Sequence, residues 1–317
     1  MTDASSGNQG GIQPFDAHGG IPTSSVTVTM QDAAPVISGK QLAHFNVAIR
    51  EIDVTDSKGR TQVVAQYSTP LVVDVLKYQS GTGANVGQTV VTDQTYRQIR
   101  FLVDIAASQA IFTDNSVAPL TFISRRDTAS DAGAGKSTVT VPAGGGLVSI
   151  SDTRRFTIGA NASELVTVDF NLFESLAPAG GSDVDASNAP GGIPTTSSGL
   201  SGGLTVRPTL FVAANSSAGQ LTGRVVNQNG DPVSGAVVVA VGQGNTVGNS
   251  AATDASGNFE LHALAAGSYR LDVYNQYTNA AGAQFTSHGA TSKQDVIRGP
   301  NITVTPGLTS STGTVTD

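Results

Sequence analysis

The sequence contains neither cysteine nor tryptophan, and only 13% of its 317 residues are charged. Without cysteine the chain can form no disulfide bond, and it offers neither a thiol nucleophile nor a cysteine-ligated metal. Glycine is abundant, with 37 residues, and serine, threonine, alanine and valine are also frequent. Small turn-forming residues and β-branched residues together favour strands joined by tight loops. The composition therefore predicts an all-β protein, and the length predicts two domains of ordinary size.

Clusters of basic residues are also missing. The net charge is −7 and the isoelectric point is about 5.0. Arg125–Arg126 and Arg154–Arg155 are isolated pairs, which are typical of solvated loops or strand ends. Proteins that bind nucleic acid need clustered lysine and arginine to displace counterions from the phosphates. We therefore expect no nucleic-acid partner.

Long apolar runs are absent as well. No stretch approaches the roughly 20 apolar residues that a membrane-spanning helix needs. Residues 1–20 have neither the basic start nor the apolar run of a secretory signal peptide. We expect no transmembrane segment in this chain, and we expect any export signal or lipid anchor to belong to a native precursor.

The pattern of the remaining residues predicts two β-sandwich domains in series behind a glycine/serine-rich N-terminal leader. Residues 1–24 show no periodicity and are expected to form a flexible leader, or one exchanged with a neighbouring chain. Apolar residues then alternate with polar ones, as at Val26, Val28 and Met30. This period of two is typical of half-buried strands. It recurs through residues 25–215 and predicts a sandwich of about ten strands without an amphipathic helix.

Between residues 177 and 203 the composition is reduced to Gly, Ser, Ala, Pro and Asp, with few other residues. We expect a long surface loop within the first domain. A binding loop and a crossover onto another subunit are the alternatives, because structureless stretches of this length are uncommon without a role. A second sandwich is predicted over residues 220–306, and the Thr/Ser-rich residues 307–317 are expected to form a tail.

The second domain carries a specific resemblance. The segments LTGRVVNQNGDPVSGAVVVA and ATDASGNFELHALAAGSYRLDV resemble the carboxypeptidase regulatory-like family, whose fold is a transthyretin-like β-sandwich. The resemblance implies a scaffold without peptidase residues, of the kind used as a spacer, an adhesion unit or a carbohydrate-binding-like module. Some related pilin-type sandwiches form a Lys–Asn cross-link, but Arg224 stands in the first strand here, so we expect none.

The first domain is similar to an uncharacterised family of bacterial lipoprotein β-sandwiches. The segments VTVTMQDAAP, FNVAIREIDV, PLVVDVLKY, TYRQIRFLVD, FTIGANASELVTVDFNL and LTVRPTLFV carry the likeness, in the order of that family. Gln31 replaces the usual threonine of its T-D-A-P turn and Ala34 is an extra residue, so no role is assigned to this turn. The resemblance implies an extracellular or cell-surface location and no known activity.

No arrangement of residues predicts catalysis. The four histidines, His18, His44, His262 and His288, lack metal-binding spacing, and no G-x-S-x-G elbow occurs. Aspartates on strands, such as Asp53 and Asp169, are explained by alternation on polar faces. We therefore expect a non-enzyme with no catalytic residue and no cofactor.

Two weaker site predictions remain. Carboxylate oxygens suit calcium, so a structural calcium ion is one reading of four loop residues, and simple Asx turns are the other; the four residues are Asp183, Asp185, Asp231 and Asp254. Tyr274 and Tyr277 form a close aromatic pair that is a candidate sugar-binding surface, with core and rim packing as the alternative.

Three functions fit these features. The leading hypothesis is a non-enzymatic structural or adhesion module of the bacterial surface, with itself or other envelope proteins as partners. The second is an extracellular filament subunit that uses β-strand exchange, for which the uncharged segments 23–29 and 301–315 are suited. The third is a surface lipoprotein that binds polysaccharide.

Overall fold

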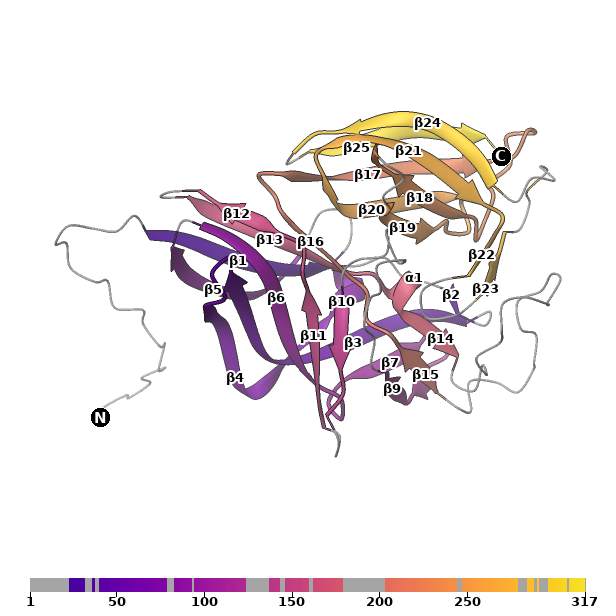
Figure 1. Cartoon of the computed structure of the whole chain (residues 1–317). Coiled ribbons are helices and arrows are strands. Elements are labelled where there is room, and N and C mark those ends of the chain that lie inside the picture. Colours follow the sequence, from indigo (N-terminus) through magenta and orange to yellow (C-terminus); the bar gives the residue numbers. More distant parts are fainter. Residues whose placement is uncertain are drawn as a thin grey trace, which may run out of the picture.

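The computed structural model is all-β and contains two domains (Figure 1), as the sequence predicts. It describes residues 23–31, 36–37, 40–78, 83–92, 94–123, 137–142, 146–159, 162–178, 203–243, 247–278, 284–287, 290, 296–306 and 308–316. Within this part of the chain, no helix is long and apolar enough to cross a membrane.

The first domain runs from the first described strand to β16. Its strands are β1 (Thr23–Gln31), β2 (Val36–Ile37), β3 (Lys40–Asp56), β4 (Thr61–Asp74), β5 (Ala84–Thr92), β6 (Gln94–Asp104), β7 (Gln109–Phe112), β8 (Val117–Ala118), β9 (Leu120–Phe122), β10 (Ser137–Thr140), β11 (Leu147–Asp152), β12 (Phe156–Ile158), β13 (Ser163–Phe170), β14 (Leu176–Pro178), β15 (Leu204–Val206) and β16 (Leu210–Ala214). Its helical turns are η1 (Val75–Lys77) and α1 (Leu172–Ser175).

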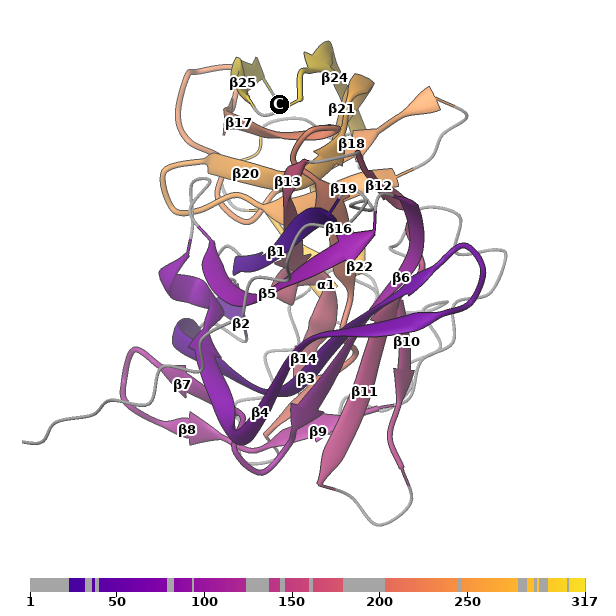
Figure 2. The same ribbon diagram turned by 90° about the vertical axis from the view of Figure 1, so that its left-hand side faces the viewer.

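The second domain follows after a turn at residues 215–217. Its strands are β17 (Ala218–Val226), β18 (Val237–Val241), β19 (Val247–Ala252), β20 (Asn258–Ala265), β21 (Gly267–Tyr274), β22 (Gln276–Thr278), β23 (Gln284–Thr286), β24 (Val296–Val304) and β25 (Thr309–Thr316). The two views in Figures 1 and 2 agree in placing this domain beside β13 and β16 of the first.

The main layers of the first domain are a four-stranded and a nine-stranded sheet. The four-stranded sheet has the order β16-β13-β1-β5, with β1 parallel to β13 and antiparallel to β5. In the larger sheet, β3 pairs with β4 on one side and with β6 and β7 on the other. A smaller sheet, β14-β15-β9, completes the domain.

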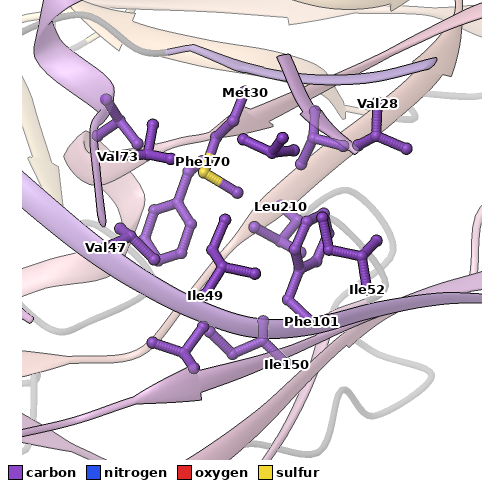
Figure 3. Close-up of a cluster of buried hydrophobic side chains, with 14 of the residues drawn as sticks. Val28, Met30, Val47, Ile49, Ile52, Val73, Phe101, Ile150, Phe170 and Leu210 are labelled. Atoms are coloured by element: carbon purple, nitrogen blue, oxygen red, sulfur yellow. The ribbon is translucent and has the colours of Figure 1, made fainter. Parts of the chain in front are cut away.

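The core of the first domain lies between these two sheets. Val28 and Met30 of β1 face Ile49 of β3 and Phe101 of β6 (Figure 3), and all four side chains are buried. The rings of Phe45 and Phe170 meet across the sheets with centroids 6.0 Å apart. Alternation in β1, β3 and β6 directs every second side chain into this layer, so burial of apolar area stabilises the sandwich.

The second domain is a smaller sandwich made of the sheets β20-β17-β25 and β19-β18-β21-β24. Leu221, Val225, Phe259, Leu261 and Leu271 are among the residues buried between them. This is the scaffold that the resemblance to the carboxypeptidase regulatory-like family implies.

At both ends of the described chain, the structure differs from the prediction. Residues 307–317 were expected to form a tail, but β25 pairs in parallel with β17 from Gln220 to Val226, and Val315 is buried in the core. At the other end, β1 lies between β5 and β13 within the same chain. Residues 23 and 24, which were expected to belong to the leader, are part of this strand, and the role of residues 23–29 in strand exchange stays a prediction. Residues 1–22 of the expected leader and 179–202 of the expected loop lie outside the described residues.

Candidate functional site at the domain junction

The turn that ends β13 brings polar side chains to the surface that the second domain covers. Asn171 is the N-cap of α1, and its Oδ1 accepts a hydrogen bond of 2.8 Å from the backbone N–H of Glu174. Asparagine is a preferred N-cap because its short side chain satisfies a free backbone donor. The cap fixes α1 directly after β13, so Asp169, Asn171 and Glu174 lie close together at the junction.

Asn249 of β19 is the centre of the junction. Its Nδ2 donates to Oδ2 of Asp169 at 2.6 Å and to the backbone oxygen of His262 at 2.8 Å. Its Oδ1 accepts from Nδ2 of Asn171 at 2.7 Å and from the backbone N–H of Ser250 at 2.8 Å. The side chain is 1% exposed. A single buried amide therefore connects β13 and the start of α1 with two strands of the second domain.

A second set of contacts is centred on Glu174. Its Oε1 accepts hydrogen bonds from the hydroxyl of Ser250 at 2.5 Å and from the hydroxyl of Tyr277 at 2.8 Å. Burial raises the pKa of Tyr277, and the neighbouring Glu174 raises it further. The ring of Tyr277 packs on Phe173 with centroids 5.8 Å apart. The hairpin β22–β23 thus fastens the second domain to α1 by an apolar contact and a charge-assisted hydrogen bond.

Asp169 and His262 are the least satisfied groups of the junction. Both residues are buried, and neither Oδ1 of Asp169 nor Nε2 of His262 has a hydrogen-bond partner. Burial raises the pKa of Asp169, and nearby His262, the Asn249 hydrogen bond and Arg154 offset this only in part. Nδ1 of His262 lies 3.1 Å from Oε1 of Gln220. An amide oxygen only accepts, so Nδ1 of His262 is the donor in this contact.

This arrangement suits docking more than catalysis. A buried polar network specifies one geometry, since any other alignment leaves polar groups unsatisfied. The hydroxyl of Ser250, which donates to the carboxylate of Glu174, is itself only 3% exposed and is not presented to a substrate. Across the described part of the chain, no three His, Asp or Glu side chains are grouped so that they could hold a metal ion.

The predicted calcium ligands are not brought into the junction. The carboxylate of Asp254 accepts from the backbone N–H groups of Ser256 and Asn258, each at 2.8 Å. Oδ2 of Asp231 lies 3.5 Å from Nδ2 of Asn227 in another turn. Asp254 thus makes a local Asx turn, whereas Asp231 lies in a turn that is capped by Oδ1 of Asn227. The calcium role stays a prediction. Asp183 and Asp185 lie outside the described residues, as do His18 and His288.

The predicted tyrosine pair does lie at the junction. Tyr274 and Tyr277 meet edge to face with ring centroids 5.6 Å apart. Both are half-buried and pack beside Val237, Val239 and other apolar residues of the junction. Packing between domains accounts for this geometry, and a sugar-binding role stays a prediction.

The sequence reasoning missed Asp169, Asn249 and His262 as members of one group. Alternation assigned Asp169 to a polar strand face, and this face is the one that the second domain covers. His262 was considered only as a metal ligand, and the spacing of the histidines gave it no role. The available signal was the N-cap pattern at 171–174, which marks a helix start directly after a strand.

Comparison with known proteins follows the same division into two parts. Residues 23–184 match the family model described as Domain of unknown function (DUF4382), and residues 220–316 match that of the carboxypeptidase regulatory-like domain. No curated protein matches the chain.

Several solved structures are similar over most of the chain, at low scores. The minor pilin GBS52 of Streptococcus agalactiae is 9% identical, covering 93% of this chain and 96% of that chain, with a TM-score of 0.23. The major pilin subunit BcpA of Bacillus cereus is 8% identical, covering 93% and 99%, with a TM-score of 0.24. A putative adhesin from Bacteroides ovatus is 8% identical, covering 91% and 88%, with a TM-score of 0.20. Scores of this size carry no argument about this chain.

The first family match spans more than half of the 317 residues. The chain therefore belongs to the family defined by the domain of unknown function DUF4382, and in it this domain is followed by a carboxypeptidase regulatory-like domain.

Proposed function

We propose that this chain is a non-enzymatic structural module of the bacterial cell surface or extracellular space, in which two β-sandwiches act as one rigid body. The observation that carries the proposal is the buried side-chain network around Asn249, which joins the two domains. A flexible tether would leave both domain faces solvated. Here Asp169 and Asn171 of one face are hydrogen-bonded to Asn249 of the other, so one orientation is favoured.

Rigidity is what a spacer or scaffold needs. Domains joined in series by loose linkers reorient freely, and they transmit neither position nor force. The turn at residues 215–217 is short, and the hairpin β22–β23 supplies a further contact through Tyr277 and Glu174. Two separate attachments restrict both bending and rotation between the sandwiches.

The structure gives less support to the other two hypotheses, which are a filament subunit that uses strand exchange and a surface lipoprotein that binds polysaccharide. Both edges of β1 are paired within the chain, so this strand is not available to a neighbour. The ring of Tyr277 packs on Phe173, and its hydroxyl donates to Glu174, so neither is presented to a sugar.

The proposal that the two sandwiches act as one rigid body is tested by distance measurements in solution. Because the chain has no native cysteine, Ser57→Cys and Ser256→Cys place one spin label in an exposed turn of each domain. Double electron–electron resonance should give one narrow distance distribution. With the same two labels, the substitution Asn249→Leu should broaden this distribution. The distance between labels at Ser57→Cys and Thr113→Cys, which both lie in the first domain, should be unaffected by it. A broad distribution in the otherwise native chain would contradict the proposal.

The location is tested separately. Antibodies raised against the purified protein should label intact cells of the source bacterium or its culture medium. Labelling that appears only after the cells are permeabilised would exclude a surface role, whatever the distance measurements show.

A further inference from the structure

The strand that begins the second domain pairs in parallel with the last strand that the structure describes (Figure 1). Gln220 of β17 is the register partner of Thr309 of β25, and Val226 is the partner of Thr316. In a parallel pair, both strands start at one end of the ladder and finish at the other. The chain therefore enters β17 at one end of this ladder and leaves β25 at the opposite end.

This connection decides how a pull acts on the domain. When the two chain ends are drawn apart, β17 and β25 are pulled in opposite directions along their length. The ladder is then loaded in shear, and its evenly spaced hydrogen bonds share the force. Strands that are pulled from the same end are instead parted one pair at a time. A shared load raises the barrier to forced unfolding, which is governed by the unfolding rate.

We propose that the second domain is a load-bearing module, which resists tension along the chain through the ladder between β17 and β25. The inference rests on the proposed structural role, because resistance to tension serves a protein that transmits force. Its test is nevertheless separate. A weak ladder would refute load bearing and leave both the docked junction and the cell-surface location as they are.

Hydrogen bonds to the first domain hold the segment through which tension enters β17. The backbone N–H of Asn215 donates to the backbone oxygen of Leu165 at 2.8 Å. The backbone N–H of Ser216 donates to Oε1 of Glu164 at 3.0 Å. Both acceptors belong to β13, so tension on the first domain reaches β17 directly.

Buried side chains hold the far end of the ladder. Val225 and Val315 are register partners, and they are 0% and 3% exposed. Sliding β25 along β17 moves both side chains out of the core. The loss of apolar burial therefore opposes shear together with the backbone hydrogen bonds.

The first domain is connected differently. Its first described strand, β1, runs parallel to β13, and its last strand, β16, runs antiparallel to β13. Ser25 near the start of β1 is the partner of Ser163, and Ala214 at the end of β16 is the partner of Val166. Both ends of this domain thus lie near the start of β13, and a pull parts the strands from there. Of the two domains, the second has the geometry that resists tension.

Stretching the full chain between two chosen points tests the inference. Because the chain has no native cysteine, two introduced cysteines define where the DNA handles for optical tweezers are attached. Ser216→Cys with Thr316→Cys loads the ladder in shear. Ser216→Cys with Leu308→Cys loads it from one end, since the backbone oxygen of Leu308 accepts from the N–H of Gln220 at 3.2 Å. All three substituted residues are exposed.

The two attachments should differ in force and agree in length. Each should release about 30–35 nm of chain, because an extended residue spans roughly 3.3–3.6 Å. At the same pulling rate, the rupture force should be at least about twofold higher in shear than from one end.

Two substitutions of the same kind show which part of the domain bears the load. Val315→Ala removes a buried side chain from the ladder, and Val273→Ala removes one from β21 in the opposite sheet, where Val273 is 0% exposed. With the shear attachment, Val315→Ala should lower the rupture force more than Val273→Ala, because the opposite sheet is still intact when the ladder yields. Load bearing by this ladder is refuted if the force in shear is less than about twofold the force from one end, or if Val273→Ala lowers it as much as Val315→Ala.

Discussion

Gly223 lies where the ring of Phe259 crosses β17. A Cβ atom at this position would be 2.7 Å from Cζ of Phe259 and 1.9 Å from Oγ1 of Thr312. The threonine can rotate, but the ring is held between the sheets. Gly223→Ala should therefore destabilise the second domain by about 1–3 kcal/mol, the usual cost of overpacking a core. Urea unfolding followed by the fluorescence of the six tyrosines would measure the change.

Gly159→Ala is the control for this substitution. There a new Cβ would have its closest neighbour, Cβ of Ala162, at 3.9 Å, which is ordinary contact. The midpoint of urea unfolding of Gly159→Ala should match that of the unmodified chain. Equal losses from both substitutions would show that close packing at Gly223 is not the cause.

Asp169 shows what the sequence could predict at this scale. Alternation in residues 165–172 correctly assigns Val166, Val168 and Phe170 to the core and Asp169 to the opposite face. It cannot show that a domain more than 40 residues further along covers this face. Burial of a polar side chain is decided by long-range contacts, which leave no periodic signal in the strand itself.

At the scale of elements, the hairpin β22–β23 is held to α1 by the ring of Tyr277 and by its hydroxyl. Tyr277→Phe keeps the ring on Phe173 and removes the donor to Glu174, which is 4% exposed. A hydrogen bond to a charged group contributes about 1.5–3 kcal/mol. Hydrogen exchange in β22 and α1 should accelerate accordingly, while the core strand β6 stays protected.

Tyr274→Phe is the matched control, since its ring also packs at the junction. We expect this substitution to leave exchange in β22 nearly unchanged. Acceleration of the same size in both variants would mean that ring packing, and not the bond to Glu174, fastens the hairpin.

Val315 anchors the last strand in the core of the second domain. Val315 is 3% exposed in the core of the second domain, whereas Thr314 next to it is exposed. Val315→Ala should cost about 2 kcal/mol through lost apolar burial and the remaining cavity. Thr314→Ala should cost much less. Thermal unfolding followed by circular dichroism would compare them, and equal losses would show that β25 does not depend on its buried side chain.

The strands that the sequence predicted are those with strong alternation or a recognised turn. Strong alternation predicted β1, β3, β6 and β13, and a recognised turn predicted β17 and β18. β5 and β19 were not predicted, because each contains a glycine and an asparagine that weaken the pattern, such as Gly87 in β5. β25 was missed because serine and threonine at most of its positions resemble a tail. Pairing with β17 overrides that local composition.

At the scale of the whole molecule, Asn249 couples the unfolding of the two sandwiches. Its side chain has hydrogen-bond partners in both domains. Asn249→Leu leaves the buried carboxylate of Asp169 without its donor, a loss of about 1–3 kcal/mol or more. Scanning calorimetry should show one transition for the unmodified chain and two for the variant.

Asn229→Ala is the control for that experiment, because Asn229 is an exposed asparagine in a turn of the second domain. It should keep the single transition. Two transitions in the unmodified chain would mean that the domains unfold independently, and the junction would then be too weak to define a rigid body.

The parallel pairing of β1 with β13 has a consequence for how the chain acquires its fold. Ser25 is the partner of Ser163, so the ends of this contact are separated by most of the domain. During synthesis, β1 can pair with β5 early, but its other edge stays open until residues 163–170 have emerged. Contacts of such high contact order slow folding to milliseconds or seconds, because a long loop must close first. The first domain therefore cannot complete its four-stranded sheet until nearly all of its residues have been synthesised.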